Sequence, residues 1–190
     1  METSKTLRII SGTLRGKKLH PFHGKGIRPT SDRTREAIFN ILSDRVRGAV
    51  VLDLFAGSGA LGIEALSRGA DMATFIDVAP AAVLLLEKNL RSCCLEERAR
   101  VIPWDIERNL NCLQAHGLQY HLIFLDPPYH RGMALTALTH LKKSQAMTPG
   151  ACLVLEHGEA DELPMPLADF ELLDQRKYGK TLVSFLSYMV

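Results

Sequence analysis

The sequence predicts an α/β fold: a doubly wound, Rossmann-like sheet of seven mostly parallel strands that ends in an antiparallel hairpin and carries a basic N-terminal β-hairpin arm. From Ala49 onward, short apolar runs rich in Val and Ile alternate with helical stretches, which is typical of βαβ units with parallel strands buried on both faces. The last two predicted strands have no helix between them, which indicates a terminal hairpin. The length of 190 residues fits one domain with an extension.

The first 47 residues are expected to form an extension that packs on a body of residues 48–190. Residues 7–11 and 17–20 are predicted to be two short strands around a turn marked by glycines. After a loop rich in Gly and Pro, Thr30 or Ser31 can cap a helix. The apolar face of this helix is expected to hold Ala37, Ile38, Ile41 and Leu42.

The elements of the body follow from the same alternation. Its strands are expected at residues 50–55, 73–78, 100–103, 121–125 and 151–156, with the hairpin at 170–178 and 181–188. Its helices are expected near residues 61–68, 80–91, 106–116 and 133–142. Pro80 is well suited to the first turn of its helix, because its backbone nitrogen needs no hydrogen bond there.

Charge is distributed unevenly along the chain. Residues 1–47 hold 11 Lys and Arg against 4 Asp and Glu, a net charge of +7, whereas the remainder carries −5, which together give the overall +2. A basic extension on a less basic body favours a polyanionic partner such as nucleic acid, although a solvated basic face is the alternative. The candidate RNA-binding residues are Arg8, Arg15, Lys17, Lys18, Arg28, Arg33 and Arg35.

Composition excludes several classes of protein. With 46% hydrophobic and 23% charged residues, the chain resembles an ordinary globular protein and not a disordered, collagenous or coiled-coil one. It has neither an apolar run long enough to span a bilayer nor a signal peptide, so we expect a cytoplasmic protein without membrane contact. The four cysteines are expected to be reduced, and the seven histidines lack the spacing of metal ligands, so no metal is expected.

The first strand of the body runs into a loop with a literal GxGxxG pattern at Gly57, Gly59 and Gly62. In a dinucleotide-binding fold, such glycines bring backbone amides against a pyrophosphate, and an acid about 20 residues further on binds the ribose, a spacing that Asp77 meets. Asp53, just before the loop, distinguishes the alternatives. Its carboxylate would repel a pyrophosphate, but it suits a cationic ligand such as the amino acid part of S-adenosylmethionine.

With that ligand, Asp77 would accept hydrogen bonds from the ribose hydroxyls, and Asp105, after the third strand, would face the adenine amine. Taken singly, Asp53 could be a loop-capping acid, and Gly59 or Gly62 could be a packing glycine. Three acids at the carboxyl ends of three successive strands, where such sheets bind ligands, favour the cofactor. The candidate cofactor-binding residues are Asp53, Phe55, Ala56, Gly57, Ser58, Gly59, Asp77 and Asp105.

The fourth strand of the body ends in four candidate catalytic residues, Asp126, Pro127, Pro128 and Tyr129, which should face the cofactor loop. An exocyclic amine of a nucleobase is a poor nucleophile, because its lone pair is delocalised into the ring. The Asp126 carboxylate and the Pro127 carbonyl can each accept one N–H, which directs the lone pair at the methyl group. The prolines hold that carbonyl rigid, and Tyr129 can stack on an extruded base. Taken alone, the motif could be a proline-rich turn with a chance Asp and Tyr.

The sequence resembles a known family, the bacterial 16S ribosomal RNA guanine-N2 methyltransferases of the RsmD type. The resemblance covers nearly the whole chain, and its most specific part is the stretch RPTSDRTREAIFN. Many amino methyltransferases share the glycine loop and the Asp-Pro-Pro-Tyr element. One departure is Asp77, which stands where many relatives carry Glu. Further matches are Arg8 to Gly12, LDLFAGSGALGIEALSRGA, Asp126 to Tyr129, and Lys177-Tyr178-Gly179.

The resemblance implies a class I S-adenosylmethionine-dependent methyltransferase fold, with residues 1–47 as an RNA-binding extension and residues 48–190 as the catalytic domain. It implies methyl transfer to the N2 amine of one guanine in small-subunit ribosomal RNA, within a ribosomal assembly particle. Three alternatives stay open: a DNA adenine-N6 methyltransferase, a nicotinamide-dependent reductase, and a non-enzymatic RNA-binding assembly factor. The short chain disfavours the first, Asp53 and the proline pair disfavour the second, and the acids at every expected position disfavour the third.

Overall fold

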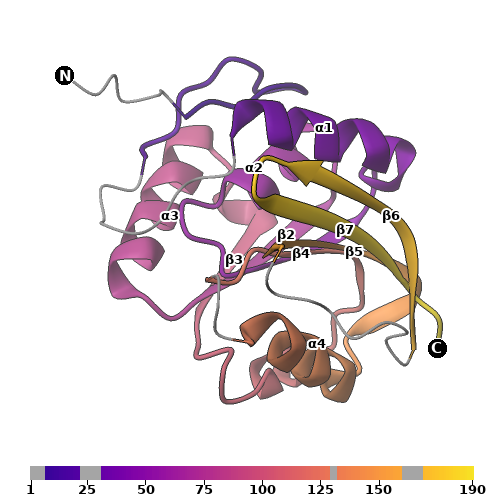
Figure 1. Ribbon diagram of the computed structural model, residues 1–190. Helices are drawn as coiled ribbons and strands as arrows, with labels where there is room; N and C mark the ends of the chain where they lie inside the picture. The colour runs from indigo at the N-terminus through magenta and orange to yellow at the C-terminus, as the bar shows by residue number, and fades with distance from the viewer. Residues whose placement is uncertain (1–6, 22–30, 129–131, 160–168) are drawn as a thin grey trace.

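The computed structural model describes residues 7–21, 31–128, 132–159 and 169–190 and confirms the doubly wound sheet (Figure 1). The strands are β1 (Val50–Leu54), β2 (Met72–Asp77), β3 (Ala99–Pro103), β4 (Tyr120–Leu125), β5 (Met147–Gly158), β6 (Phe170–Tyr178) and β7 (Thr181–Tyr188). They lie in the order β3-β2-β1-β4-β5-β7-β6. The first five pair in parallel, whereas β7 is antiparallel to both β5 and β6. The predicted antiparallel hairpin therefore closes one edge of the sheet.

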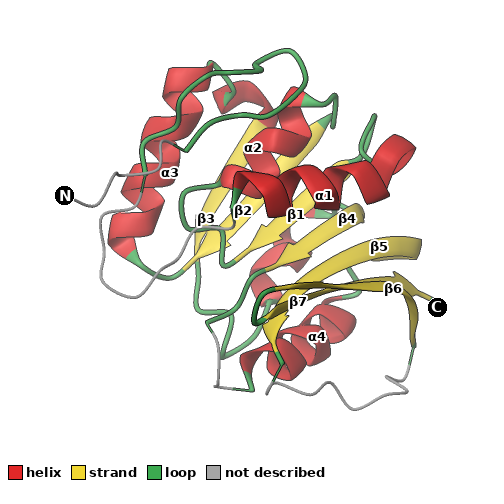
Figure 2. Ribbon diagram, turned by 45° about the horizontal axis from the view of Figure 1, so that its top comes forward, coloured by secondary structure: helices red, strands yellow, loops and turns green. Residues whose placement is uncertain are grey.

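Helices cover both faces of the sheet (Figure 2). They are the α-helices α1 (Asp32–Leu42), α2 (Ala60–Ser67), α3 (Pro80–Cys93) and α4 (Met133–Ser144), and the 3-10 helices η1 (Ser43–Arg45), η2 (Glu96–Arg98) and η3 (Asn111–His116). On one face α1, α2 and α3 share a core with Val51 and Phe124. On the other face α4 and η3 share a second core with Leu52 and Ile123.

The prediction of an α-helix at residues 106–116 is wrong, because only the 3-10 helix η3 forms there. Asp105 Oδ1 accepts a hydrogen bond from the Glu107 amide at 3.0 Å, and Asn109 Oδ1 accepts one from the Asn111 amide at 3.0 Å. Such side-chain turns compete with the backbone hydrogen bonds of an α-helix. The buried apolar residues that give this segment its helix-like spacing are Ile106, Leu110 and Leu113.

Helix α1 begins at one of the two predicted caps: the Ser31 hydroxyl accepts a hydrogen bond from the Thr34 amide at 3.1 Å. Its buried face is rotated from the expected one, because Phe39 packs against Phe124 of β4 with ring centroids 5.6 Å apart. Ile41, expected in the core, is 37% exposed instead. The residues that α1 buries are Thr34, Arg35, Ile38, Phe39 and Leu42.

Residues 7–21, here called the N-terminal arm, turn back on themselves but form no strands of the length expected. One antiparallel bridge joins Arg8 and Lys18. Gly12 has a φ of +84°, and a Cβ added to it would lie 1.9 Å from the Ser67 carbonyl oxygen, so the arm fits against the end of α2 only with glycine there. The buried apolar side chains of the arm are Leu7, Ile9 and Leu19. They belong to the core of α1, α2 and α3, so the arm and the body share one core.

Candidate active site

Four carboxylates lie at the carboxyl edge of the parallel strands. Asp53 is the last residue but one of β1, Asp77 is the last residue of β2, Asp105 follows β3 by two residues, and Asp126 follows β4 directly. The strands β1 and β4 are neighbours in the sheet although two strands separate them in the sequence. The four acids therefore lie along one edge of the sheet, which includes the switch point where open α/β sheets bind their ligands.

The loop between β1 and α2 is held in unusual backbone conformations. Phe55, Gly57 and Gly59 have φ angles of +60°, +54° and +77°. A Cβ added to Gly59 would lie 2.3 Å from Leu86 Cδ1, so this glycine lets α2 pack closely on α3. A Cβ added to Gly57 would meet only the Phe55 carbonyl oxygen, at 3.9 Å, so the space beside this glycine is open. Gly59 therefore serves packing, and Gly57 leaves room for a ligand near the backbone.

Asp53 lies beneath this loop and is only 2% exposed. Its Oδ2 accepts a hydrogen bond from the Gly62 amide at 2.9 Å. Burial raises the pKa of Asp53 to about 7; the Gly62 hydrogen bond opposes the rise, and the charge of Asp77 adds to it. A Cβ added to Gly62 would lie 2.3 Å from Phe75 Cε1, so Gly62 is also a packing glycine. In this structure Asp53 acts as the loop-capping acid. Because it is buried, its negative charge can act on a ligand mainly through its electric field and not through direct contact.

Asp77 connects β2 to the glycine loop. Its Oδ2 accepts a hydrogen bond from the Gly57 amide at 2.8 Å, and its Oδ1 accepts one from the Ala79 amide at 2.9 Å. The next residue, Val78, is 60% exposed. An exposed apolar side chain beside this acid offers a surface for a flat ring, and the sequence analysis did not identify it.

Asp105 occupies the turn after β3. Its Oδ1 accepts from the Glu107 amide, and its Oδ2 lies 3.3 Å from the Arg108 guanidinium Nε, so the carboxylate stabilises its own turn. The backbone amide of the preceding Trp104 donates to the Asp77 carbonyl oxygen at 3.1 Å. This hydrogen bond holds the turn after β3 against the end of β2, which places Asp105 and Asp77 on neighbouring parts of the edge.

A hollow of about 150 Å³ opens next to the glycine loop. It is lined by Phe55, Ile106, Glu107, Met133 and Thr136, which come from the end of β1, the turn after β3 and the start of α4. Sequence reasoning named only Phe55 among these residues. No local pattern could have found the set, because the sheet order brings three distant segments together.

Asp126, Pro127 and Pro128, three of the four predicted catalytic residues, directly follow β4. Asp126 follows Leu125, which pairs in parallel with Leu54, so Asp126 and Phe55 leave neighbouring strands at the same level. The Asp126 side chain is half-buried, Pro127 is buried and Pro128 is exposed. Tyr129, and Arg28 of the predicted RNA-binding set, lie outside the described residues.

The other basic residues of the predicted RNA-binding set differ in how far their side chains are exposed. Arg8, Arg15, Lys18 and Arg33 are exposed, and Lys17 is half-buried. Arg8 is also 3.3 Å from Asp32 in an ion pair at the surface.

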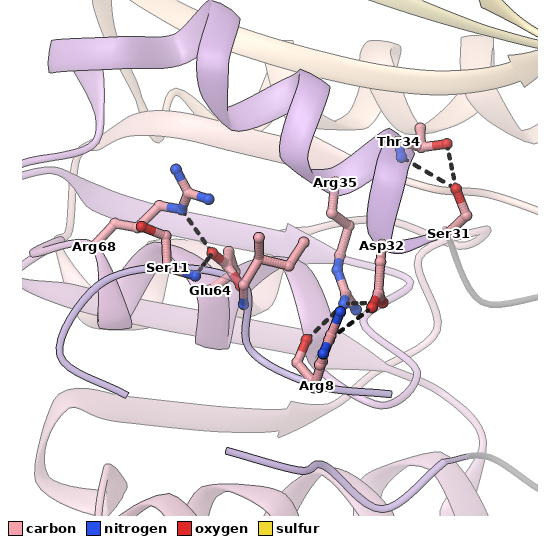
Figure 3. Close-up of polar contacts among 9 residues, drawn as sticks. Arg8, Ser11, Ser31, Asp32, Thr34, Arg35, Glu64 and Arg68 are labelled. Carbon is pink, nitrogen blue, oxygen red and sulfur yellow. Dashed lines mark hydrogen bonds and ion pairs between the residues drawn. The ribbon is translucent and has the colours of Figure 1, made fainter. Parts of the chain in front are cut away.

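The prediction that Arg35 binds RNA is wrong, because its side chain is only 1% exposed and offers no surface to RNA in this structure. Its Nη2 donates to the Arg8 carbonyl oxygen at 2.7 Å and to Asp32 Oδ1 at 2.8 Å (Figure 3). Burial lowers the pKa of Arg35, against the opposing charges of Asp32 and Glu64. Arg35 therefore holds the arm from inside, and a basic residue in an amphipathic helix gave no signal of this.

Glu64 of α2 holds the arm from the other side (Figure 3). Its carboxylate accepts hydrogen bonds from the Ile10 amide at 2.7 Å, the Ser11 amide at 3.0 Å and the Arg68 Nε at 2.7 Å. Ser67, one turn later, donates to the Ser11 carbonyl oxygen at 2.6 Å. Sequence reasoning missed both residues, because their partners lie more than fifty positions away.

Metal binding and membrane insertion each require a recognisable structural feature. Within the described ranges, no group of three or more His, Cys, Asp or Glu side chains could hold a metal ion. In the same part of the chain, no helix is both long and apolar enough to cross a membrane.

Known proteins share this architecture. The family model described as conserved hypothetical protein 95 matches residues 7–187. Ribosomal RNA small subunit methyltransferase D of Haemophilus influenzae is 37% identical over 96% of this chain and 93% of that protein. The solved structure of hypothetical protein TTHA0928 from Thermus thermophilus is 33% identical, with a TM-score of 0.80 over 97% of this chain and 100% of that chain. The structure of SMU.776 complexed with SAH shares the fold at 16% identity, with a TM-score of 0.65 over 85% of this chain and 50% of that chain.

Proposed function

The chain belongs to the family described as conserved hypothetical protein 95, together with ribosomal RNA small subunit methyltransferase D, and we propose that it is an S-adenosylmethionine-dependent methyltransferase of ribosomal RNA. Its acceptor is the exocyclic N2 amine of one guanine in 16S ribosomal RNA, presented in the cytoplasm within a ribosomal assembly particle. The observation that supports this most is the position of Asp126 beside the glycine loop, across the switch point between β1 and β4.

The carboxyl edge fits S-adenosylmethionine because a buried acid, an open glycine and exposed apolar surface occur together. Gly57 leaves room for the ligand next to the backbone, and Asp77, which bonds to the Gly57 amide, accepts hydrogen bonds from the ribose in this proposal. Val78 offers apolar contact to the adenine, and Asp105 can accept from the adenine amine. Asp53 favours the cationic amino acid part from beneath the loop. When bound, S-adenosylmethionine supplies a methyl group that the sulfonium already activates.

Asp126 and Pro127 orient the target amine. The Asp126 carboxylate and the Pro127 carbonyl oxygen each accept one N–H, so the nitrogen lone pair points at the methyl group and the developing positive charge is stabilised. The nitrogen would form its bond to the methyl group as the bond from that group to sulfur broke, with the electron pair left on sulfur. The nitrogen then loses one proton to the Asp126 carboxylate or to water, which restores a neutral amine. Tyr129 is proposed to stack on the extruded base.

The basic extension supplies the RNA contacts in this proposal. Arg8, Arg15, Lys18 and Arg33 present exposed charges, and Lys17 presents part of one. Such residues bind phosphates without reading the sequence, so they position the RNA while the pocket at Asp126 selects the amine. The same division of roles is proposed for Arg28.

Replacement of Asp126 tests the catalytic assignment. The protein, Asp126→Ala and the control Asp71→Ala, an exposed acid at the opposite end of β2, are incubated with methyl-labelled S-adenosylmethionine. Small-subunit particles, naked 16S ribosomal RNA and duplex DNA serve as substrates, and digested nucleosides are identified. We expect N2-methylguanosine from ribosomal RNA, with kcat about 10² to 10³ lower in Asp126→Ala and cofactor affinity retained. N6-methyladenosine from DNA would refute the proposed substrate, and a collapse of cofactor binding at full turnover would refute the role of Asp126.

A further inference from the structure

Asn89 of α3 joins the N-terminal arm to the glycine loop. This residue is fully buried. Its Oδ1 accepts a hydrogen bond from the His20 amide of the arm at 2.8 Å. Its Nδ2 donates to the His20 carbonyl oxygen at 3.2 Å and to the Ser58 carbonyl oxygen of the glycine loop at 2.9 Å. One side chain therefore connects two segments that are 38 residues apart, since His20 and Ser58 bond to the same amide group.

The partners of Asn89 leave it a single orientation. The opposite orientation of the amide would place Nδ2 against the His20 N–H and Oδ1 against two carbonyl oxygens, which would lose all three hydrogen bonds. In the observed orientation both amide hydrogens are used. A substitution that removes the amide takes this donor away from the carbonyl groups of both the arm and the loop.

The contact at Ser58 fixes one peptide of the glycine loop. The carbonyl group of that peptide accepts from Asn89, and its N–H, which belongs to Gly59, donates to the Ala56 carbonyl oxygen at 2.7 Å. This peptide joins Ser58 to Gly59, and Ser58 is flanked by two glycines with φ angles of +54° and +77°, which would otherwise have broad conformational freedom. Asn89 therefore restrains the loop beside Gly57, the position that leaves room for a ligand, without being among the residues assigned to the cofactor.

The contact at His20 fixes the end of the arm. Upstream, Glu64 and Ser67 hold the arm to α2, and His20 is where it also bonds to α3. Both the amide and the carbonyl group of His20 bond to Asn89, so a movement of the arm backbone at this point must displace the Asn89 side chain. The same displacement would release the Ser58 carbonyl.

We propose that Asn89 is a positioning residue that links the arm to the glycine loop, so that RNA bound to the arm and cofactor bound to the loop affect each other's affinity. The loop-positioning part needs only the hydrogen bonds above; the RNA part rests on the proposed function. Coupling between two binding sites is reciprocal, so RNA that favours the observed arm position must raise cofactor affinity by the same factor that cofactor raises RNA affinity.

Two substitutions at Asn89 test the loop. Asn89→Leu removes all three hydrogen bonds at similar size, and Asn89→Asp keeps an acceptor for the His20 amide but turns the donor to two carbonyls into a second acceptor. Lys88→Ala, an exposed neighbour on the same helix, is the control. Calorimetry with S-adenosylhomocysteine should give a dissociation constant about tenfold higher for both Asn89 variants and unchanged for the control. In turnover, the KM for S-adenosylmethionine should rise while kcat at saturation stays near wild type.

A pair of substitutions at His20 separates the arm from the loop. His20→Ala keeps the backbone amide that bonds to Asn89, whereas His20→Pro lacks it but leaves the Ser58 contact in place. The affinity for S-adenosylhomocysteine is measured with and without saturating 16S ribosomal RNA or small-subunit particles. We expect RNA to change this affinity in the wild type and His20→Ala, to change it less in His20→Pro, which keeps only the carbonyl contact to Asn89, and to leave it unchanged in Asn89→Leu. If Asn89→Leu does not fold, Asn89→Asp and His20→Pro carry the test.

The outcomes are distinguishable. Unaltered S-adenosylhomocysteine affinity in the folded Asn89 variants would overturn the positioning role. If the variants bind S-adenosylhomocysteine more weakly but RNA still changes that affinity as much as in the wild type, the link to the arm would be overturned. The link would also be overturned if bound RNA left the cofactor affinity of the wild type unchanged. If neither RNA nor particles bind the wild type, the proposed function fails together with the RNA part, while the S-adenosylhomocysteine comparison still decides whether Asn89 positions the loop.

Discussion

Replacing Asp53 by Asn should make the protein more stable and its cofactor binding weaker. Burial raises the pKa of Asp53 from 3.8 to about 7, so the folded protein holds this proton more tightly than the unfolded chain does. The stability that the protonated group contributes is therefore complete below pH 4 and is lost as the pH rises through about 7. At about 1.36 kcal/mol per pH unit, the charged carboxylate costs about 4 kcal/mol above pH 7.

The asparagine side chain cannot ionise, and its oxygen can still accept from the Gly62 amide, so Asp53→Asn escapes this cost. Between pH 5 and pH 8, the gain over wild type should grow by about 2 to 3 kcal/mol, because the unfolded wild-type chain has lost this proton whereas the folded protein keeps it up to about pH 7. Cofactor affinity should change in the opposite direction. Loss of the negative charge beneath the loop should weaken binding of S-adenosylmethionine at pH 8 by about 2 kcal/mol, the energy of two unit charges about 8 Å apart at an effective dielectric constant of about 20.

Urea unfolding at pH 5 and pH 8, with calorimetry at pH 8, measures both effects. Asp71→Asn, which removes the same charge from an exposed position, should change neither stability nor affinity appreciably. A gain in stability that is equal at both pH values would show that the charge of Asp53 is not the cause. Unchanged cofactor affinity would show that the charge beneath the loop does not act on the ligand.

Two further predictions concern the arm. Replacing Arg15, Lys17 and Lys18 together by Ala should weaken RNA binding and leave cofactor affinity unchanged. In a salt titration, the slope of log K against log salt should fall by about 0.7 to 0.9 for each phosphate that is no longer bound. An unchanged slope would show that these three residues are only solvated and do not contact RNA. Glu64→Gln should lower the free energy of unfolding by about 1 to 3 kcal/mol, because the new amide NH₂ group would face N–H groups of the arm. Urea unfolding measures this loss. The control Glu87→Gln, at an exposed ion pair on α3, should have little effect.

The architecture could be predicted because it depends on local patterns. The first strand was expected at residues 50–55 and forms at Val50–Leu54, and the terminal hairpin agrees at both strands. The exceptions have identifiable causes. Residues 106–116 carry helix-like apolar spacing, but side-chain turns at Asp105 and Asn109 occupy the amides that a helix needs. The face of α1 could not be predicted, because it depends on a contact between Phe39 and a residue of β4.

The site could be predicted as a set of acids at one edge, but the partner of each acid could not. The motifs place Asp53 and Asp77 at the ends of parallel strands, and this alone brings them together. Which amides they accept from depends on the turn of the loop. Asp53 accepts a hydrogen bond from the Gly62 amide, and Asp77 accepts one from the Gly57 amide. Each acid therefore stabilises the loop as well as lying near the candidate ligand site.

Charge alone also cannot tell a surface contact from an internal one. Arg35 and Arg33 are close in the same basic stretch, yet α1 turns Arg33 outward and buries Arg35 against the arm. Two nitrogens of the Arg35 guanidinium, Nε and Nη1, are buried without a hydrogen-bond partner among the described residues. The cost of burying these two nitrogens must therefore be offset by the bonds of Arg35 to the Arg8 carbonyl and Asp32, which hold the arm to α1.

The burial of these bonds determines how the arm can present its charges. A flexible basic tail would adapt to any phosphate arrangement, but the arm is bonded through its backbone to Glu64 of α2, Asn89 of α3 and Arg35 of α1. Helix α2 starts at the glycine loop, and Asn89 bonds to the same loop. The backbone that carries the exposed cations of the arm is thus tied to the carboxyl edge. Under the proposed function, an RNA that pairs with these cations would bring its target base toward Asp126 from a defined direction, so phosphate contacts would orient the RNA and the pocket would select the base.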